Sequence, residues 1–567
     1  MSILERLKER RVIQWSLSYL GVAWLIVQVA DAVADQWNIP APLLRRLDVI
    51  LLMGLFFAVV IAWYHGEKGR QRVSGPELII LAGLTLASGT LLSFAGGENP
   101  ADAEEPQPLP TPQDGTVAVL PFVDLSPAGD HRYFADGVAE EIVSALTRDD
   151  RVRVAARTSS FALRDRPVTE VGEILSVAAV LEGSVRTDGD VVRVTARLVS
   201  AADGFEIWAR QFDRSLDRIL EVQAEISSAV VAELVGAPRA ATQAQRIPPE
   251  AYDSYLQARF FWNRRTEEDL LRSLDLFTRA TELAPDYARA YSGLADTYAV
   301  LGFYQYLSPE QAFPAATEFA EKALDLDPGL SDALATIAYT RLYFEWDWAA
   351  AEDGFRQAIR ANPRYPVAHQ WYGNLLVVLG RTEEATTEIR AALEFDPLSM
   401  IARSALPWAY HYGGEYERAL ELFRQNIAMD ETFMVNHYFM GATLVQTGDL
   451  AGAISAFERA VLLSDSSALT VAGLARALAV ANRPGEAEAL LGRLLDPSRT
   501  PAPPRYEIAK VYLALGRAAE GFEWLDEALE TRAAQLPFLA VDPELEGWSA
   551  DPRFIELVAA MKLDGIP

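Results

Sequence analysis

Residues 371–397, WYGNLLVVLGRTEEATTEIRAALEFDP, have the pattern of two helices joined at a glycine and ended by a proline. Gly380 stands at the turn, where glycine accepts the left-handed backbone that commonly ends a helix. Pro397 ends the second helix, because the residue before a proline disfavours the helical region. Ala385 and Ala392 are small enough to let two helices approach closely. The stretch therefore predicts one antiparallel helix pair.

The same residue types return every 34 residues through the second half of the chain. The turn position carries glycine, or asparagine once, at Gly380, Gly414, Gly448, Asn482 and Gly516. The small residue of the second helix returns at Ala351, Ala385, Ala419, Ala453, Ala487 and Gly521. A period of this length with small residues at helix crossings indicates helix pairs stacked into a solenoid.

This pattern resembles the tetratricopeptide repeat family and covers residues 250–533. The register divides it into eight units: 251–285, 286–328, 329–363, 364–397, 398–431, 432–465, 466–499 and 500–533. About nine extra residues near 303–311 predict a longer turn in the second unit, and Pro407 predicts a kink in a first helix. Residues 534–567 are expected to form a C-terminal cap.

The resemblance implies a concave groove built from the first helix of each pair. By register, the candidates for binding a protein there are Arg289, Asp296, Tyr343, Gln370, Asn374, Trp408, His411, Tyr412 and Tyr438. The alternative for each is ordinary packing or solvated surface, since aromatic residues dominate both cores and interfaces. Lysine is scarce in this region, so a basic clamp for a peptide carboxylate is not favoured.

Ahead of the repeats, residues 115–237 have the pattern of an α/β domain. Apolar runs predict buried strands at 116–122 and 152–156, and helical spacing predicts helices over 131–148, 168–177 and 216–235. Residues 178–213 alternate and break at Asp188-Gly189 and Asp203-Gly204. Such dipeptides favour hairpin turns, so three antiparallel strands are expected.

The stretches VAVLPFVDLS, YFADGVAEEIVSAL, ARTSSF, VLEGSVR and QAEISSAVV resemble the TolB amino-terminal-like domain family, over about 115–236. The resemblance implies helices against a mixed sheet and a recognition or assembly module rather than a catalyst. Members of this family are often joined to repeats, DNA-binding domains or nucleotide cyclases. No DNA-binding or cyclase domain is visible in this sequence.

A group of acidic residues and a histidine follows the first strand of this domain: Asp124, Asp130, His131, Asp136, Glu140 and Glu141. An active site is one interpretation. In the structural interpretation, Asp124 stabilises a turn and Asp130 caps the following helix. The other carboxylates lie in the first half of that helix, where negative charge complements the helix dipole. We favour the latter, because no HExxH, GxSxG, Walker A or glycine-rich dinucleotide motif occurs. No catalytic residue, cofactor or metal is predicted.

Three hydrophobic segments open the chain, at about 12–33, 47–65 and 78–97. Their lengths suit transmembrane helices, and the alternative of a buried helical hairpin is weaker because no amphipathic partner surrounds them. Basic residues gather before the first segment and between the second and third. The positive-inside rule then predicts a cytoplasmic N-terminus and a membrane anchor over 1–97. The sequence Ala32–Ala34 allows signal-peptidase cleavage as an alternative.

Composition limits the function further. The net charge of -28 and pI near 4.7 argue against nucleic acid as a partner, since phosphates require a clustered positive face. The chain has no cysteine, which excludes disulfides, thiol nucleophiles and cysteine-ligated zinc. Residues 98–114 are acidic and proline-rich, and are expected to form a linker.

These observations predict a multidomain chain with transmembrane helices, an α/β domain with a mixed sheet, and an all-α solenoid. We expect a non-enzymatic scaffold or sensor in a bacterial inner membrane, with residues after about 97 in the periplasm. It would bind proteins through the repeat groove and the TolB-like domain. A receptor for a small ligand that signals through the spans is the alternative, and an enzyme with an unrecognised site is a third hypothesis.

Overall fold

The computed structural model describes residues 113–126, 132–149, 151–188, 191–236, 246–264, 266–304, 306–498 and 503–563, together with Tyr19, Ala23 and Leu51. The chain divides into two compact units, Met1–Pro110 and Thr111–Pro567. Apart from those three residues, the predicted spans lie outside the described residues, as do the linker up to residue 112 and His131. The Tyr19 hydroxyl donates to the Leu51 carbonyl oxygen at 2.9 Å. Within the part of the chain that is described, no helix is long and apolar enough to cross a membrane.

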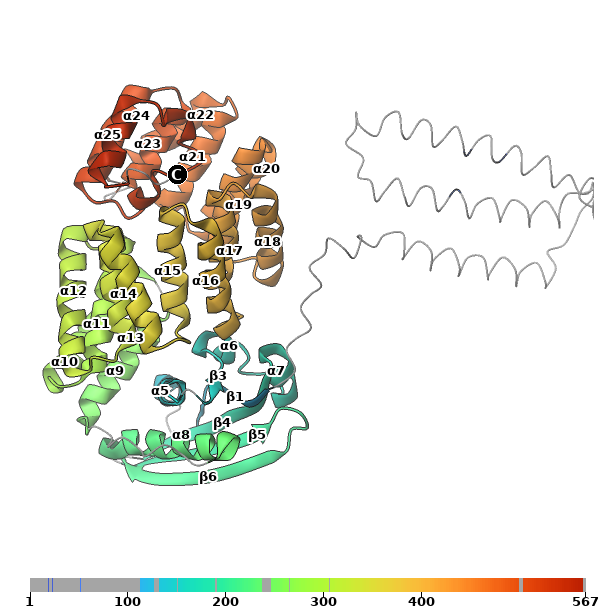
Figure 1. Cartoon of the computed structure of the whole chain (residues 1–567), viewed down its shortest axis with the longest axis vertical. Helices are drawn as coiled ribbons and strands as arrows, with labels where there is room; N and C mark the ends of the chain where they lie inside the picture. The colour runs from blue at the N-terminus through green and yellow to red at the C-terminus, as the bar shows by residue number, and fades with distance from the viewer. Residues whose placement is uncertain are drawn as a thin grey trace, which may run out of the picture. The chain divides into compact units, whose positions relative to one another are not determined.

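The first part of the second unit is built on one mixed sheet (Figure 1). Its strands are β1 (Gln113–Val119), β2 (Val123–Asp124), β3 (Arg153–Val154), β4 (Val177–Asp188), β5 (Val191–Ser200) and β6 (Glu206–Ser215). Their order is β3-β1-β4-β5-β6, with β2 paired to β4. β1 runs parallel to β3 and β4, whereas β4, β5 and β6 are antiparallel. The predicted mixed sheet is confirmed.

Helices cover both faces of the central strand β1. Val117 and Val119 share a core with α5 (Arg132–Thr147) and α8 (Ile219–Val235). Ala118, between them in sequence, packs in a second core with α7 (Val168–Leu175). This alternation follows from the two-residue period of a strand. A short helix that was not predicted, α6 (Arg157–Ala162), follows β3.

The rest of the second unit is an all-α solenoid, as predicted (Figure 1). Its described helices pair as α9 (Pro249–Trp262) with α10 (Glu267–Leu283), α11 (Ala288–Phe303) with α12 (Pro309–Leu326), α13 (Ser331–Thr340) with α14 (Trp348–Ala361), α15 (Pro366–Val378) with α16 (Thr382–Phe395), α17 (Met400–Tyr412) with α18 (Tyr416–Met429), α19 (Met434–Thr447) with α20 (Leu450–Leu463), α21 (Ala468–Val480) with α22 (Pro484–Leu494), and α23 (Arg505–Ala514) with α24 (Ala518–Glu530). A last helix, α25 (Pro552–Ala560), follows. Helix α17 runs through Pro407.

The 34-residue register has the expected physical basis. The turn glycines have φ of 69°, 77°, 82° and 74°, and Asn482, which replaces one of them, has φ 58°. The register alanines from Ala351 to Ala487 are fully buried. A Cβ on Gly373 would lie 2.6 Å from Ile389 Cγ1, so the paired helices touch too closely there for any larger residue.

The acidic residues of α5 form a buried joint between the sheet and the first repeats. Glu140 is 8% exposed and pairs with Arg157 at 2.7 Å and with Arg259 of α9 at 2.5 Å. Glu141 is 5% exposed, pairs with Arg289 of α11, and accepts a 2.9 Å hydrogen bond from the Tyr255 hydroxyl. Burial alone would raise the pKa of Glu140, but Arg259 and Arg157 outweigh it and lower that pKa.

This joint corrects the role predicted for these carboxylates. They were expected to complement a helix dipole, but they are buried and hold cations from other elements. Asp136 follows the same pattern, since it accepts from Arg164 at 2.7 Å. The turn role of Asp124 is confirmed, because its Oδ1 accepts from the Ser126 amide at 2.9 Å. Asp130 lies outside the described residues.

A second joint ties the sheet domain to the middle of the solenoid. Asp396, between α16 and α17, accepts from both the backbone amide and the hydroxyl of Ser159 in α6, at 3.0 and 2.5 Å. The Ser159 hydroxyl oxygen in turn accepts from the Leu398 amide at 2.8 Å. The two joints hold α5 and α6 against repeats that are far apart in sequence.

Candidate functional site

The first-helix side of the solenoid, called the groove here, is covered by residues that follow the last repeat. After α24 the chain leaves the helical stack and makes two short turns, η3 (Leu536–Phe538) and η4 (Glu546–Trp548), before α25. Residues 532–546 are called the resident segment here. They contact helices of the third, fifth, seventh and eighth repeats.

An aromatic side chain anchors the resident segment. The Phe538 ring lies 5.0 Å from Trp408, 5.3 Å from Tyr412 and 6.5 Å from Tyr343, measured between centroids. Phe538 is 6% exposed. Three predicted groove residues are thus brought together, but around a ring of the same chain. Edge-to-face pairs of this kind stabilise beyond the buried area alone.

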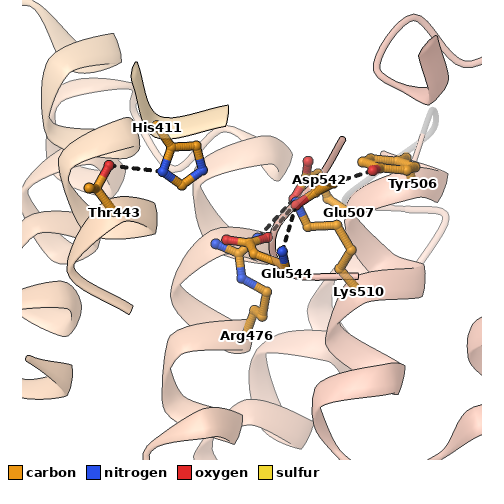
Figure 2. Close-up of polar contacts among 8 residues, drawn as sticks. All are labelled: His411, Thr443, Arg476, Tyr506, Glu507, Lys510, Asp542 and Glu544. Atoms are coloured by element: carbon orange, nitrogen blue, oxygen red, sulfur yellow. Dashed lines mark hydrogen bonds and ion pairs between the residues drawn. The ribbon is translucent and has the colours of Figure 1, made fainter. Parts of the chain in front are cut away.

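A charged cluster holds the next turn of the resident segment (Figure 2). Lys510 Nζ of α23 lies 3.0 Å from Asp542 Oδ2 and 2.6 Å from Glu544 Oε2. Arg476 of α21 also pairs with Glu544. Glu507 of α23 stands 3.5 Å from both cations. The Tyr506 hydroxyl donates to Asp542 Oδ2 at 2.8 Å.

The charges of this cluster do not balance. Two cations face three carboxylates, and every one of these side chains is at most 7% exposed. Burial alone would raise the pKa of Asp542, but Lys510 outweighs it and lowers that pKa. Burial raises the pKa of Glu544, which Arg476 and Lys510 offset only in part. The cluster therefore carries an excess negative charge that the protein interior disfavours.

The pairing of the cluster is also incomplete. Among the described residues, Arg476 Nε, Arg476 Nη2 and Glu544 Oε1 have no hydrogen-bond partner, and Glu507 Oε2 has only its two ion pairs at 3.5 Å. Buried polar atoms without a partner cost free energy, so the resident segment does not satisfy the groove fully.

Two further contacts fasten the chain near the third repeat. Arg532 donates to the Phe344 carbonyl oxygen, and its guanidinium lies 4.5 Å from the Trp346 ring. The Trp348 indole donates to the carbonyl oxygens of Met561 and Lys562 at 3.0 and 3.1 Å. The residues after α24 therefore bridge from the last repeat back to the third.

The groove position follows the repeat register. Asn374, Trp408, Ala442, Arg476 and Lys510 stand at one position of five successive first helices. Asn374 and Trp408 were predicted, whereas Arg476 and Lys510 were not, although the same spacing leads to them. The available signal was a charged residue at a position that is uncharged in the three preceding repeats. A basic clamp for a peptide carboxylate was not favoured, and these two cations pair with carboxylates of the same chain.

Other predicted groove residues lie in internal contacts and not on an open surface. Asp296 is buried and accepts from Thr336, and Tyr438 packs 5.4 Å from Phe457. Arg289 holds Glu141, as described above. Asp296 contacts α13 of the next repeat, Tyr438 contacts α20 of its own repeat, and Arg289 contacts α5 of the sheet domain.

Three more predicted residues lie beside the groove. Asn374 is partly exposed and donates to the Tyr343 hydroxyl at 3.4 Å, and Gln370 donates to Asn374 at 3.5 Å. His411 is buried and contacts the Thr443 hydroxyl at 3.1 Å (Figure 2). Burial lowers the pKa of His411 to about 3, so the imidazole is neutral at physiological pH. Within the described residues, no group of three or more His, Cys, Asp or Glu side chains could hold a metal ion.

No protein-family model matches the chain. Part of it is similar to a protein named putative adenylate cyclase 3 of Rhizobium meliloti, at 32% identity over 205 residues, which are 35% of each chain. It is also similar to the transcriptional regulator HilA of Salmonella typhimurium, at 22% identity over 61% of this chain and 63% of that one. The chain thus spans about a third of the first relative and less than two thirds of the second.

Among solved structures, the repeats are similar to YrrB, described as a TPR protein with an unusual peptide-binding site. The identity is 22%, and the match covers 34% of this chain and 95% of that one, with a TM-score of 0.25.

Proposed function

We propose that the chain is a non-enzymatic, membrane-anchored scaffold that binds proteins through its repeat groove. The observation that carries the proposal is the groove itself, which combines an aromatic pocket with a buried pair of cations and already holds an irregular peptide segment. A tetratricopeptide-type solenoid presents surface and offers no reaction chemistry of its own. The names of the partial relatives describe those proteins, and a cyclase or DNA-binding activity is not proposed here.

The proposed placement comes from the sequence. Three apolar segments and the distribution of basic residues support an anchor in a bacterial inner membrane, with the sheet domain and repeats in the periplasm. The TolB-like resemblance supports a second recognition module in the sheet domain. A receptor for a small ligand remains the second hypothesis.

Photo-crosslinking in cells tests partner binding. A photoreactive residue in place of Asn374 would stand at the groove position of α15, and the same residue in place of the exposed Thr387 on α16 is the control. We expect the groove position to give a discrete crosslinked protein that the control does not give. The same bands from both positions, or none from a folded and abundant protein, would reject the groove as a binding site.

The absence of cysteine provides a clean test of the placement. A single cysteine at Thr387 is expected to react with a membrane-impermeant maleimide in cells with a permeabilised outer membrane. A single cysteine at Lys8, in the predicted cytoplasmic tail, is expected to react only after lysis. Thr387→Cys labelling that also requires lysis would contradict a periplasmic repeat domain.

A further inference from the structure

We infer that the groove recognises acidic protein segments that place an aromatic residue four positions before one carboxylate and six before another, and that residues 538–544 occupy it as an internal copy of such a ligand. This inference rests on the proposed function and states the chemistry of its partner. Three observations carry it: the anchors of the resident segment, the charge of the groove, and the poor fit of the occupant.

The anchors define a short motif. Phe538 enters the aromatic pocket, Asp542 meets Lys510, and Glu544 meets both Lys510 and Arg476. All three side chains come from one stretch, LPFLAVDPEL at 536–545, that belongs to no repeat helix. Binding hot spots are well-packed and desolvated, and the groove side contributes Trp408, Tyr412 and Arg476, which are residue types enriched in them.

The charge of the groove selects the partner. Without the resident segment, the cluster would hold Arg476, Lys510 and the single carboxylate Glu507, which is a net positive charge. This is an unusual site in a chain of net charge -28. Buried cations without partners are strongly disfavoured, so the groove requires carboxylates from whatever fills it. A basic or neutral segment would leave Glu507 as the one carboxylate of the cluster beside both cations.

The resident segment does not satisfy every polar atom of the cluster. It brings two carboxylates to a site with a surplus of one positive charge, and it leaves one of the Glu544 oxygens and two Arg476 nitrogens without hydrogen bonds. A partner that supplies the aromatic residue and both carboxylates from another chain could take the place of the resident segment. A partner can bind only while the resident segment is out of the groove. The apparent affinity for that partner is therefore the intrinsic affinity multiplied by the fraction of molecules with an open groove.

A peptide-binding experiment with the full-length protein in detergent tests the inference. The probe is a fluorescent peptide with the sequence of residues 533–548, read by anisotropy. The protein is the wild type or the variant Phe538→Ala/Asp542→Asn/Glu544→Gln, whose own segment is weakened. We expect the variant to bind the peptide at least about tenfold more tightly than the wild type. The control peptide carries the same three substitutions and is expected to bind neither protein.

Other results would overturn the inference. One is a triple variant that binds both peptides equally or binds neither of them. This result counts if the variant is folded, which is shown when the amides of α13–α19 keep their protection from hydrogen exchange. Another is a wild-type dimer that dissociates in the variant, since the occupant would then be the segment of a second copy. If the triple variant does not fold, Asp542→Asn/Glu544→Gln replaces it, with the same expectation.

The two proposals can fail separately. A crosslinked partner at Asn374 without peptide binding would preserve the scaffold and reject this motif. Peptide binding without any cellular partner would support the motif and reject the scaffold.

Discussion

Glu140→Gln is expected to destabilise the joint between the sheet domain and the repeats by about 3–5 kcal/mol, the usual cost of removing one partner from a buried ion pair. The substitution leaves Arg157 and Arg259 without their shared carboxylate. Their side chains are only 23% and 21% exposed, so water cannot replace it well. Glutamine has nearly the same shape, so the effect reports charge and not packing.

Hydrogen exchange measures this effect locally, which matters because a chain of several domains need not unfold in one step. The amides of α5 and α9 are expected to exchange about 150- to 5,000-fold faster in the variant, which corresponds to that free energy. The matched control is Glu173→Gln on α7, where the side chain is exposed and little change is expected. Equal effects of the two substitutions would contradict a buried joint.

The pH dependence has a definite sign. The pKa of Glu140 is lower in the folded protein than its usual value of 4.5. Its contribution is therefore complete above about pH 4.5 and is lost as the pH falls through the lower folded pKa. The difference between wild type and Glu140→Gln should accordingly shrink on acidification below pH 4.5, and a constant difference would indicate a role other than charge.

The repeat architecture was predictable because its cause is local and periodic. A turn that needs a left-handed residue selects glycine or asparagine, and the chain repeats this requirement at Gly380, Gly414, Gly448, Asn482 and Gly516. The hairpin strands of the sheet domain were predictable for a similar reason, since a turn signal and a two-residue alternation lie within one short stretch.

The joint and the groove contents were not predictable, because they depend on residues far apart in sequence. Glu140 and Arg259 are separated by 119 positions, and nothing near either one indicates the other. The acidic residues of α5 fit a dipole role by their position alone, and only the fold shows them buried. The resident segment has no helical or strand period, so its pattern carried no information about where it packs.

Arg476 and Lys510 were not predicted, although the sequence contains the information to locate them. Both stand at the groove position of their repeats, at the same spacing that identified Asn374 and Trp408. A buried charged side chain at a position that is uncharged in the three preceding repeats requires a partner, because an unpaired buried charge is too costly. The spacing therefore locates the two cations, and their charge implies that an acidic residue pairs with them. The structure identifies these acidic residues as Asp542 and Glu544.

Lys510→Met provides the strongest test of that cluster. Lys510 is 6% exposed and contacts three carboxylates, and its removal leaves Arg476 as the one cation among these five side chains. Methionine keeps most of the volume and apolar length of the side chain, so the loss is one of charge. We expect a destabilisation of about 3–5 kcal/mol, measured as faster hydrogen exchange in α21 and α23. Lys322→Met on the exposed side of α12 is the control.

A second substitution separates charge from packing. In the double variant Lys510→Met/Glu544→Gln, one of the stranded carboxylates is removed, and we expect recovery of about 1–3 kcal/mol. Acidification should act in the same direction, because protonation of Asp542 and Glu544 relieves their repulsion in Lys510→Met, whereas the wild type keeps the contribution of ionised Asp542 down to about pH 3.8. The gap between wild type and Lys510→Met should therefore narrow from pH 7 to pH 4. A gap that is unchanged by both treatments would show that Lys510 stabilises the fold by packing, and the groove would then have no charge preference for an acidic partner.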